Sequence, residues 1–323
     1  MILNRTTVSF PEILSQSAGE HGGLQRDCLE NALRLMNDMG MAREVQRQLL
    51  SRKMRDVPGV DFAARCVPAR ELGGDFYDLR PCGTRRLALA LGDVSGKGTA
   101  AALLGALTIG ILRTHTVNQW VCPSDVLAAL NNYIVANRVD SRFVAMLFAA
   151  LDTNTRRLAL SNAGCPYPLL LRRGSVEQIE VSGMPLGLFE DTRYDSLSLD
   201  LEPGDVLVFA SDGILECENV EQEPFGARGL GALLNSLPLE TSAETVCSAI
   251  LSATNEFARN SSEPDDDRSI LVLRVLNDTR ADFSTIAYEL PHQSAEGFDF
   301  ALPSCVGNEY GKFGGPGACG GTF

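Results

Sequence analysis

Four short acidic segments, far apart in the sequence, contain the residues whose types and spacing are best suited to chemistry. They are residues 73–78, 92–98, 211–213 and 265–269. Each lies next to an apolar run that is typical of a strand, so each is expected where a buried sheet meets a loop. Carboxylates gathered at strand ends repel one another unless cations lie between them, and hard divalent ions prefer oxygen ligands. The sequence therefore predicts a metal site.

Asp93 is the central carboxylate of this prediction. It comes directly after an apolar run at residues 87–91, where a turn out of a strand is expected. Gly96 and Gly98 allow a tight turn, so that backbone carbonyls as well as a carboxylate can face an ion. Asp212 repeats this arrangement after a second apolar run. Taken alone, each segment also fits an ordinary turn or a solvated loop, and only the ordered set indicates a site.

Two further positions complete the set. Asp75 follows two glycines, and Asp266 and Asp267 immediately precede the last strand. Four carboxylates at strand ends can bridge two cations about 3.5–4 Å apart, which acidify water and neutralise charge on a phosphoryl group. This chemistry requires no Ser–His or Cys–His dyad, in agreement with the presence of only three histidines. Residues 92–99 do not match the spacing of a phosphate-binding P-loop, so we do not expect a nucleotide site.

The composition narrows the class of protein. A net charge of −13 argues against nucleic acid and against an anionic membrane surface as partners. The nine cysteines include no Cys-x-x-Cys pair, which argues against zinc and fits reduced thiols. No signal peptide is expected in the first 20 residues, and no apolar run is long enough to span a bilayer. We therefore expect a cytoplasmic protein.

A polar helix is expected over residues 27–54. Its apolar positions recur at alternating spacings of three and four, with one polar member, at Ala32, Leu35, Met39, Ala42, Gln46 and Leu49. This pattern fits a dimerising helix pair and equally a single amphipathic helix on the flank of the domain. Gln46 and Gly40 weaken the repeat.

Strands dominate the remainder of the chain and are joined mostly by turns. They are expected at residues 60–67, 86–91, 143–151, 157–160, 168–172, 176–180, 197–201, 206–210 and 269–275. Helices are expected at residues 97–114, 124–138, 230–236 and 242–259, with Ser124 and Ser242 at the starts of two of them. Because the strands come in groups and do not alternate with helices, we predict an α+β fold in which a β-sandwich is flanked by helices.

The predicted organisation has four parts. Residues 1–26 form a flexible segment, residues 27–57 a linker or dimerisation helix, residues 58–276 the main domain, and residues 277–323 a disordered tail.

Residues 41–275 resemble the bacterial SpoIIE/RsbU-type serine phosphatases of the PPM (protein phosphatase type 2C-like) superfamily. The segments that carry the resemblance are residues 69–78, 92–98, 161–164, 185–187, 203–205, 211–216 and 266–269. The resemblance implies a central sandwich of two antiparallel sheets between helices (α-β-β-α), preceded by an N-terminal linker helix. It also implies two Mn²⁺ or Mg²⁺ ions and hydrolysis of phosphoserine or phosphothreonine on a protein.

Carried over to this sequence, the resemblance assigns the metal ligands. Asp93 would bridge both ions, with the Val94 carbonyl as a further ligand. Asp75 would hold one ion, and Asp212 and Asp266 the other.

The resemblance also suggests roles around the metals. Arg70 stands where relatives can carry a phosphate-binding arginine, so Asp93, Asp75 and Arg70 are the catalytic candidates. Asp78 and Asp267 either orient metal-bound water or are solvated side chains. Cys165 replaces a histidine that is common in relatives, and we expect this change to alter a loop and not the metal centre.

In such relatives the substrates are phosphorylated anti-sigma-factor antagonists, small STAS-domain proteins of partner-switching pathways. Regulation by a separate partner or by a homodimer through residues 27–54 is expected here. Two other classes remain open from the sequence alone. One is a catalytically weak module that binds a phosphoprotein with the same fold, and the other is a structural dimerisation protein.

Overall fold

The computed structural model describes residues 22–50, 57–82, 86–116, 122–137, 142–258 and 266–276, with side chains in the first helix from residue 29 onward. The predicted tail at residues 277–323 and most of the predicted flexible segment lie outside the described residues. Within the described part, no helix is both long enough and apolar enough to cross a membrane.

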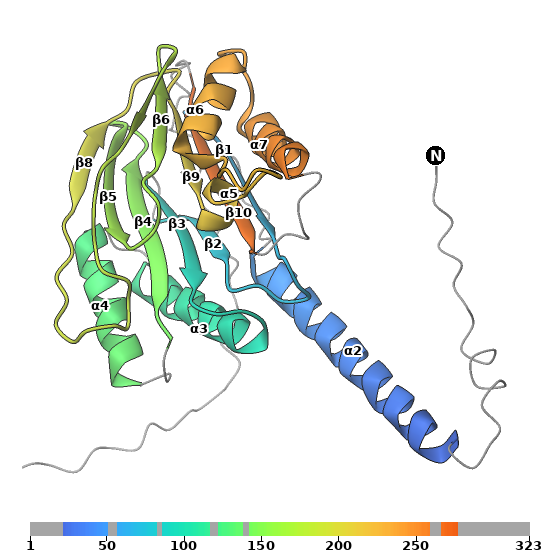
Figure 1. Cartoon of the computed structure of the whole chain (residues 1–323). Coiled ribbons are helices and arrows are strands. Elements are labelled where there is room, and N and C mark those ends of the chain that lie inside the picture. The colour runs from blue at the N-terminus through green and yellow to red at the C-terminus, as the bar shows by residue number, and fades with distance from the viewer. Residues whose placement is uncertain are drawn as a thin grey trace, which may run out of the picture. The chain divides into compact units, whose positions relative to one another are not determined.

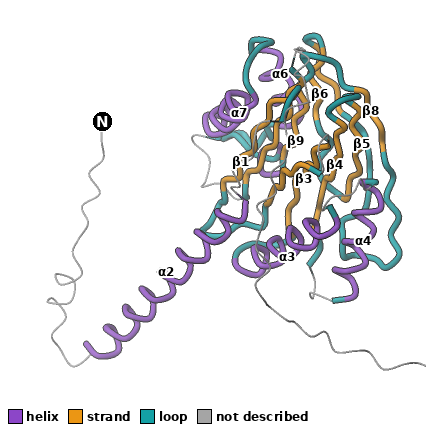
Figure 2. Tube along the Cα trace, turned by 180° about the vertical axis from the view of Figure 1, so that it is seen from behind, coloured by secondary structure: helices purple, strands orange, loops and turns teal. Residues whose placement is uncertain are grey.

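Two five-stranded antiparallel sheets form the domain (Figures 1 and 2). The first has the strand order β1 (Val60–Val67), β10 (Arg268–Val275), β9 (Val206–Ala210), β6 (Leu169–Arg172) and β7 (Ser175–Gln178). The second has the order β2 (Phe76–Pro81), β3 (Arg86–Val94), β4 (Val144–Asp152), β5 (Arg157–Ala163) and β8 (Leu197–Asp200).

Helices cover the outer face of each sheet (Figure 1). The second sheet is covered by α3 (Thr99–His115) and α4 (Pro123–Ala136), and the first by α6 (Gly226–Ser236) and α7 (Ala243–Phe257). A short helix, α5 (Asp212–Leu215), follows β9, and α2 (Gly22–Leu50) precedes the domain. The predicted α-β-β-α sandwich with an N-terminal helix is confirmed.

Strand β3 shows how the sequence builds three buried layers. Leu87, Leu89 and Leu91 point into the core between the sheets, whereas Ala88 and Ala90 contribute to the core beneath α3 and α4. Both faces of this central strand are therefore apolar, as expected for a strand covered on both sides. The alternation also means that the next odd-numbered residue, Asp93, belongs to the row that faces the opposite sheet.

Some predicted boundaries were wrong for identifiable reasons. β3 extends to Val94, so Asp93 pairs with Ala145 inside the ladder and does not lie in the turn. Helix α4 starts after Cys122 with a proline in its first turn, so Ser124 is not its N-cap. Ser242 is the N-cap of α7 as predicted, because its side chain accepts a hydrogen bond from Thr245 N.

Two further differences concern whole elements. Residues 73–78 were predicted only as an acidic segment, whereas residues 76–81 form strand β2, and α2 begins at Gly22, five residues earlier than predicted. The strands predicted at residues 197–201 and 206–210, which correspond to β8 and β9, were expected to be joined by a turn. They belong to different sheets, since β8 pairs with β5 whereas β9 pairs with β10 and β6.

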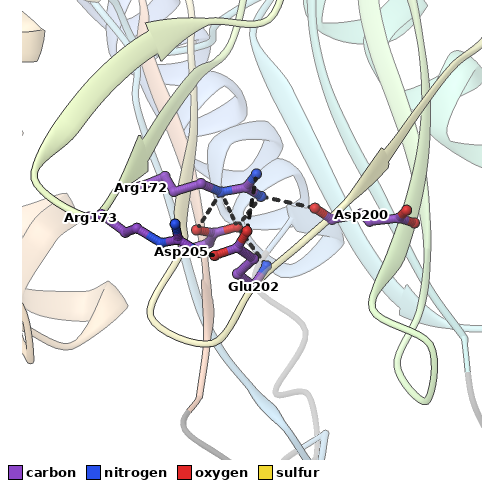
Figure 3. A network of polar contacts seen from close by, with 5 residues as sticks. All are labelled: Arg172, Arg173, Asp200, Glu202 and Asp205. Carbon is purple, nitrogen blue, oxygen red and sulfur yellow. Dashed lines mark hydrogen bonds and ion pairs between the residues drawn. The ribbon is translucent and has the colours of Figure 1, made fainter.

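The crossover from β8 to β9 is held by a polar network (Figure 3). Arg172 donates to the buried Asp205 through Nε (3.0 Å to Oδ1) and Nη2 (2.6 Å to Oδ2), and its Nη2 also donates to Asp200 O (2.9 Å). Asp205 Oδ2 additionally accepts from Glu202 N at 2.7 Å, while Arg173 pairs with the Glu202 carboxylate. The network therefore fixes the turn at which the chain changes sheets.

Candidate metal centre

Asp93 and Asp75 meet where β2 and β3 pair. Phe76 stands opposite Gly92, so Asp75 lies beside the end of β3 that carries Asp93. Gly74 allows this approach, because a Cβ added there would lie 2.7 Å from Val94 O and 3.2 Å from Asp93 Oδ1. The structure therefore brings Asp75, Asp93 and the Val94 carbonyl together.

Asp212 and Asp266 meet in the same way at the end of the other sheet. Ala210 of β9 pairs with Ile270 of β10, so the segments that contain the two aspartates run side by side. The contact is close, since a Cβ added to Gly213 would lie only 1.9 Å from the carbonyl oxygen of Asp267. A glycine after Asp212 is thus required by the neighbouring backbone and not by an ordinary turn.

Asp267 joins the two halves of the site. Its carboxylate, on the first sheet, accepts hydrogen bonds from Ala69 N (2.7 Å), Gly74 N (2.7 Å) and Asp75 N (3.4 Å). It is buried, and these donors all belong to the loop that leads into β2. Of the alternatives left open for this residue, a solvated side chain is excluded. Asp267 instead fixes the backbone that carries Asp75.

The electrostatics of the cluster show carboxylates that repel one another. Burial, followed by the nearby charge of Asp93, raises the pKa of Asp75 well above its usual range. Burial and the charge of Asp212 raise the pKa of Asp93 to about 6. The pKa of Asp212 is also raised, chiefly by burial, and Asp266 adds to it through its charge. These effects place all four aspartates in one electrostatic unit, in which a cation would relieve the repulsion.

Two observations test whether divalent ions fit here. Asp75 Oδ2 is buried, and it has no hydrogen-bond partner among the described residues. Lys97 Nζ lies 3.4 Å from Asp266 Oδ2, so a positive group already approaches the outermost carboxylate. Both features suit an all-oxygen donor set that accepts cations.

The four aspartates are brought together, but they do not form a closed set of metal ligands. Within the described ranges, no three or more His, Cys, Asp or Glu side chains are placed so that they could hold one metal ion by themselves. Magnesium-type sites commonly keep several waters and use only one or two carboxylates, so a closed cage is not required for the ions expected here. The donor set therefore fits.

The structure places Asp78 and Arg70 away from these contacts. Asp78 is buried in the helix layer, where its Oδ1 accepts from Arg113 Nη2 at 2.7 Å. The same Arg113 nitrogen donates to Leu49 O of α2. Through Arg113, Asp78 therefore helps to hold β2, α3 and α2 together. Arg70 is exposed, and among the described residues its side chain forms no hydrogen bond or ion pair with the aspartates.

Sequence reasoning missed Gln46. Its side chain donates to Gly73 O (2.8 Å) and accepts from Gly73 N (3.4 Å), so α2 holds the loop that carries Asp75. The available signal was a polar residue at an otherwise apolar position of the helix repeat. That residue seemed only to weaken the repeat, whereas it marks a contact with the domain.

Cys165 lies below the site. Its backbone is held by the Asn162 side chain, which accepts from Cys165 N and donates to Cys165 O, both at 2.8 Å. Burial raises the pKa of the Cys165 thiol well above its usual range, which keeps the sulfur protonated. This supports the expectation that the residue shapes a loop and is not a nucleophile.

The sandwich of two antiparallel sheets between helices matches the fold of solved PP2C-type phosphatase domains. The chain is similar to the SiaA-PP2C domain of Pseudomonas aeruginosa, with a TM-score of 0.67 and 19% identity over 76% of this chain and 98% of that one. It is also similar to the RsbU and RsbW domains of Rv1364c from Mycobacterium tuberculosis, with a TM-score of 0.61, 27% identity, and coverage of 69% and 62% respectively.

Residues 83–276, more than half of the chain, match the family described as Stage II sporulation protein E (SpoIIE), and the chain belongs to this family. It is 29% identical over 185 residues to the phosphoserine phosphatase RsbU of Bacillus subtilis (strain 168), which corresponds to 57% of this chain and 55% of RsbU. The chain thus spans about half the length of that relative. The resemblance predicted from the sequence is confirmed.

Proposed function

We propose that this protein is a metal-dependent serine/threonine phosphatase that hydrolyses phosphoserine or phosphothreonine on a regulatory protein. The observation that supports this most directly is the convergence of Asp75, Asp93, Asp212 and Asp266 in a fold shared with PP2C-type domains, where burial and neighbouring charges raise the pKa values of Asp75, Asp93 and Asp212. Relatives of the chain include RsbU and RsbP of Bacillus subtilis, both named phosphoserine phosphatases.

Two divalent ions, Mn²⁺ or Mg²⁺, are proposed as cofactors. Asp93 would contribute to both, with the Val94 carbonyl as a further ligand, Asp75 would hold one, and Asp212 and Asp266 the other. A similar fold, that of RsbX, has been solved in complex with magnesium. When bound, such ions acidify water for attack and neutralise the charge that develops on the phosphoryl oxygens.

The chain's own residues prepare this site. Asp267 fixes the backbone of the Asp75 loop through three N–H donors. Asp75 and Asp93 hold protons more tightly than ordinary carboxylates, and they release them when positive charge arrives. Arg70, exposed on the same loop, is proposed to contact the phosphate of an incoming substrate.

The proposed substrate is a phosphorylated STAS-domain anti-sigma-factor antagonist of a partner-switching pathway. RsbU and RsbP support this assignment, as does a structural neighbour solved in work on the bacterial stressosome. The cysteines of the described residues are all free, which supports a cytoplasmic location.

Helix α2 is the proposed regulatory element. It exposes large apolar side chains along its length, among them Leu35, Met36, Met41 and Val45. Such a surface fits a homodimer through residues 27–54 or a separate protein partner. Removing residues 1–56 should change both the mass in solution and the activity. If neither changes, this regulatory role is wrong.

The function is tested by phosphate release from a phosphorylated STAS protein and from p-nitrophenyl phosphate, titrated with Mn²⁺. We expect activity only with metal. Asp93→Asn and Asp212→Asn should each lower it more than about a hundredfold, since even the hydrogen-bond partners of metal ligands change activity by about 10–100-fold. The matched control is Asp191→Asn at an exposed site, which should have no effect. Binding of the phosphoprotein without phosphate release by the wild type would instead favour the binding-module alternative.

A further inference from the structure

The loop that follows Asp93 and Val94, at the end of β3, is held by the residues that lead into β4. Ser95 N donates to Phe143 O at 2.9 Å, and Phe143 N donates to Ser95 Oγ at 2.8 Å. Arg142 adds a further contact, because its Nη1 donates to Ser95 O at 2.7 Å. Three hydrogen bonds therefore hold Ser95, the residue that follows Val94.

Gly96 shows how closely the arginine fits this loop. It has a positive φ of 88°, and a Cβ added there would lie 2.4 Å from Arg142 Nη1 and 3.5 Å from its Cζ. The guanidinium thus lies against the bare backbone of Gly96, in the space that any other side chain would occupy. A left-handed glycine and a charged donor together define the turn after Val94.

The contacts of Arg142 lie on the backbone that directly follows Val94. Val94 pairs with Val144, and both belong to the core beneath α3 and α4. Arg142 lies two residues before β4 begins, and its guanidinium contacts Ser95 and Gly96. The arginine therefore supports the Asp93–Val94 segment through the turn at the end of β3.

We propose that Arg142 is a positioning residue, which holds the Asp93–Val94 segment in the conformation that binds the divalent ions. A partly buried hydrogen bond from a charged donor is stronger than one between neutral groups. If part of this stabilisation is lost from the metal-competent loop, the affinity for metal falls. This inference rests on the proposed metal centre, but its main measurement requires no catalysis.

The test is Mn²⁺ binding by isothermal titration calorimetry on the full chain. Arg142→Ala should raise the dissociation constant about tenfold, equivalent to about 1.4 kcal/mol. Arg142→Lys, which keeps one charged donor, should recover part of the loss. Arg193→Ala, at an exposed arginine outside these contacts, is the matched control and should bind as the wild type does. Asp93→Asn identifies the heat that belongs to this site.

A second measurement separates positioning from substrate contact. At saturating Mn²⁺, the KM of Arg142→Ala for p-nitrophenyl phosphate should stay within about twofold of the wild-type value. Unchanged Mn²⁺ affinity in Arg142→Ala would overturn the proposal, and a raised KM with unchanged affinity would assign the arginine to phosphate binding instead. Thermal unfolding in chelator verifies that the variant is folded. If the wild type binds Mn²⁺ but releases no phosphate, the proposed function fails while this inference stands.

Discussion

Without metal, the protein should become less stable as the pH rises from about 4 to about 7. Asp93 has its pKa raised from the ordinary 3.8 to about 6 by burial and by the charge of Asp212. A carboxyl with a raised pKa binds its proton more tightly in the folded than in the unfolded chain. Its contribution to stability is therefore complete below about pH 4 and is lost as the pH passes through 6.

The size of the effect follows from this one residue. Moving a pKa from 3.8 to about 6 corresponds to about 3 kcal/mol. Asp93 is partly accessible, so solvent screening reduces this figure, and about 2 kcal/mol is a fair expectation. The raised pKa values of Asp75 and Asp212 act in the same direction. Divalent ions bind the deprotonated carboxylates, so saturating Mn²⁺ should abolish or reverse the pH dependence.

The assay is urea unfolding at pH 4.0 and 7.5, in chelator and in Mn²⁺. Asp93→Asn is the decisive variant, because its side chain is neutral at both pH values. In chelator it should be more stable than the wild type at pH 7.5, and it should lose the part of the slope that belongs to Asp93, while Asp75 and Asp212 keep the remainder. A wild-type protein that is equally stable at both pH values without metal, or an Asp93→Asn variant that keeps the full slope, would show that the aspartates are not electrostatically coupled as described.

Three other substitutions test the hydrogen bonds, the close backbone contact and the buried ion pair described above. Asp267→Asn should cost about 2–4 kcal/mol of unfolding free energy, since a charged acceptor of short backbone hydrogen bonds is lost, and it should weaken Mn²⁺ binding in calorimetry. Gly213→Ala should cost about 1–3 kcal/mol by overpacking against Asp267 O and should also weaken Mn²⁺ binding; a neutral result would mean that the close contact is wrong. Arg172→Met should cost about 2–4 kcal/mol by leaving Asp205 buried and unpaired, yet leave the Mn²⁺ titration of activity unchanged.

The gathering of the aspartates was predictable because Asp93, Asp212 and Asp266 lie at or next to the ends of apolar strands and Asp75 follows two glycines. The strand ends of a sandwich lie together at its edge, so aspartates at several such ends are expected to lie close to one another. The sequence could not distinguish Asp78 from Asp267, since both are carboxylates near strand ends. The register decides: Asp78 lies two residues after Phe76, in the layer beneath the helices, whereas Asp267 faces the Asp75 loop.

The change of sheet between β8 and β9 was not predictable from local pattern. Residues 197–210 satisfy a hairpin equally well, because both arrangements need an extended segment, a Pro-Gly turn and a second extended segment. The choice between a hairpin and a change of sheet depends on Arg172, more than 20 residues earlier, which donates a hydrogen bond to Asp205. The contacts of Gln46 and Arg142 are likewise long-range pairings that leave no periodic trace in the sequence.

The first and last strands of the domain are neighbours. Val60 at the start of β1 stands opposite Val275 at the end of β10, and Leu276 N donates to Gly59 O at 3.0 Å. The two ends of the sandwich therefore lie side by side, although the proposed metal ligands between them span nearly 200 residues. A circularly permuted version, with these ends joined by a short linker and new termini in an exposed hairpin such as residues 152–155, should keep every ligand in place. The same geometry lets the domain be placed within a longer polypeptide without disturbing its interior.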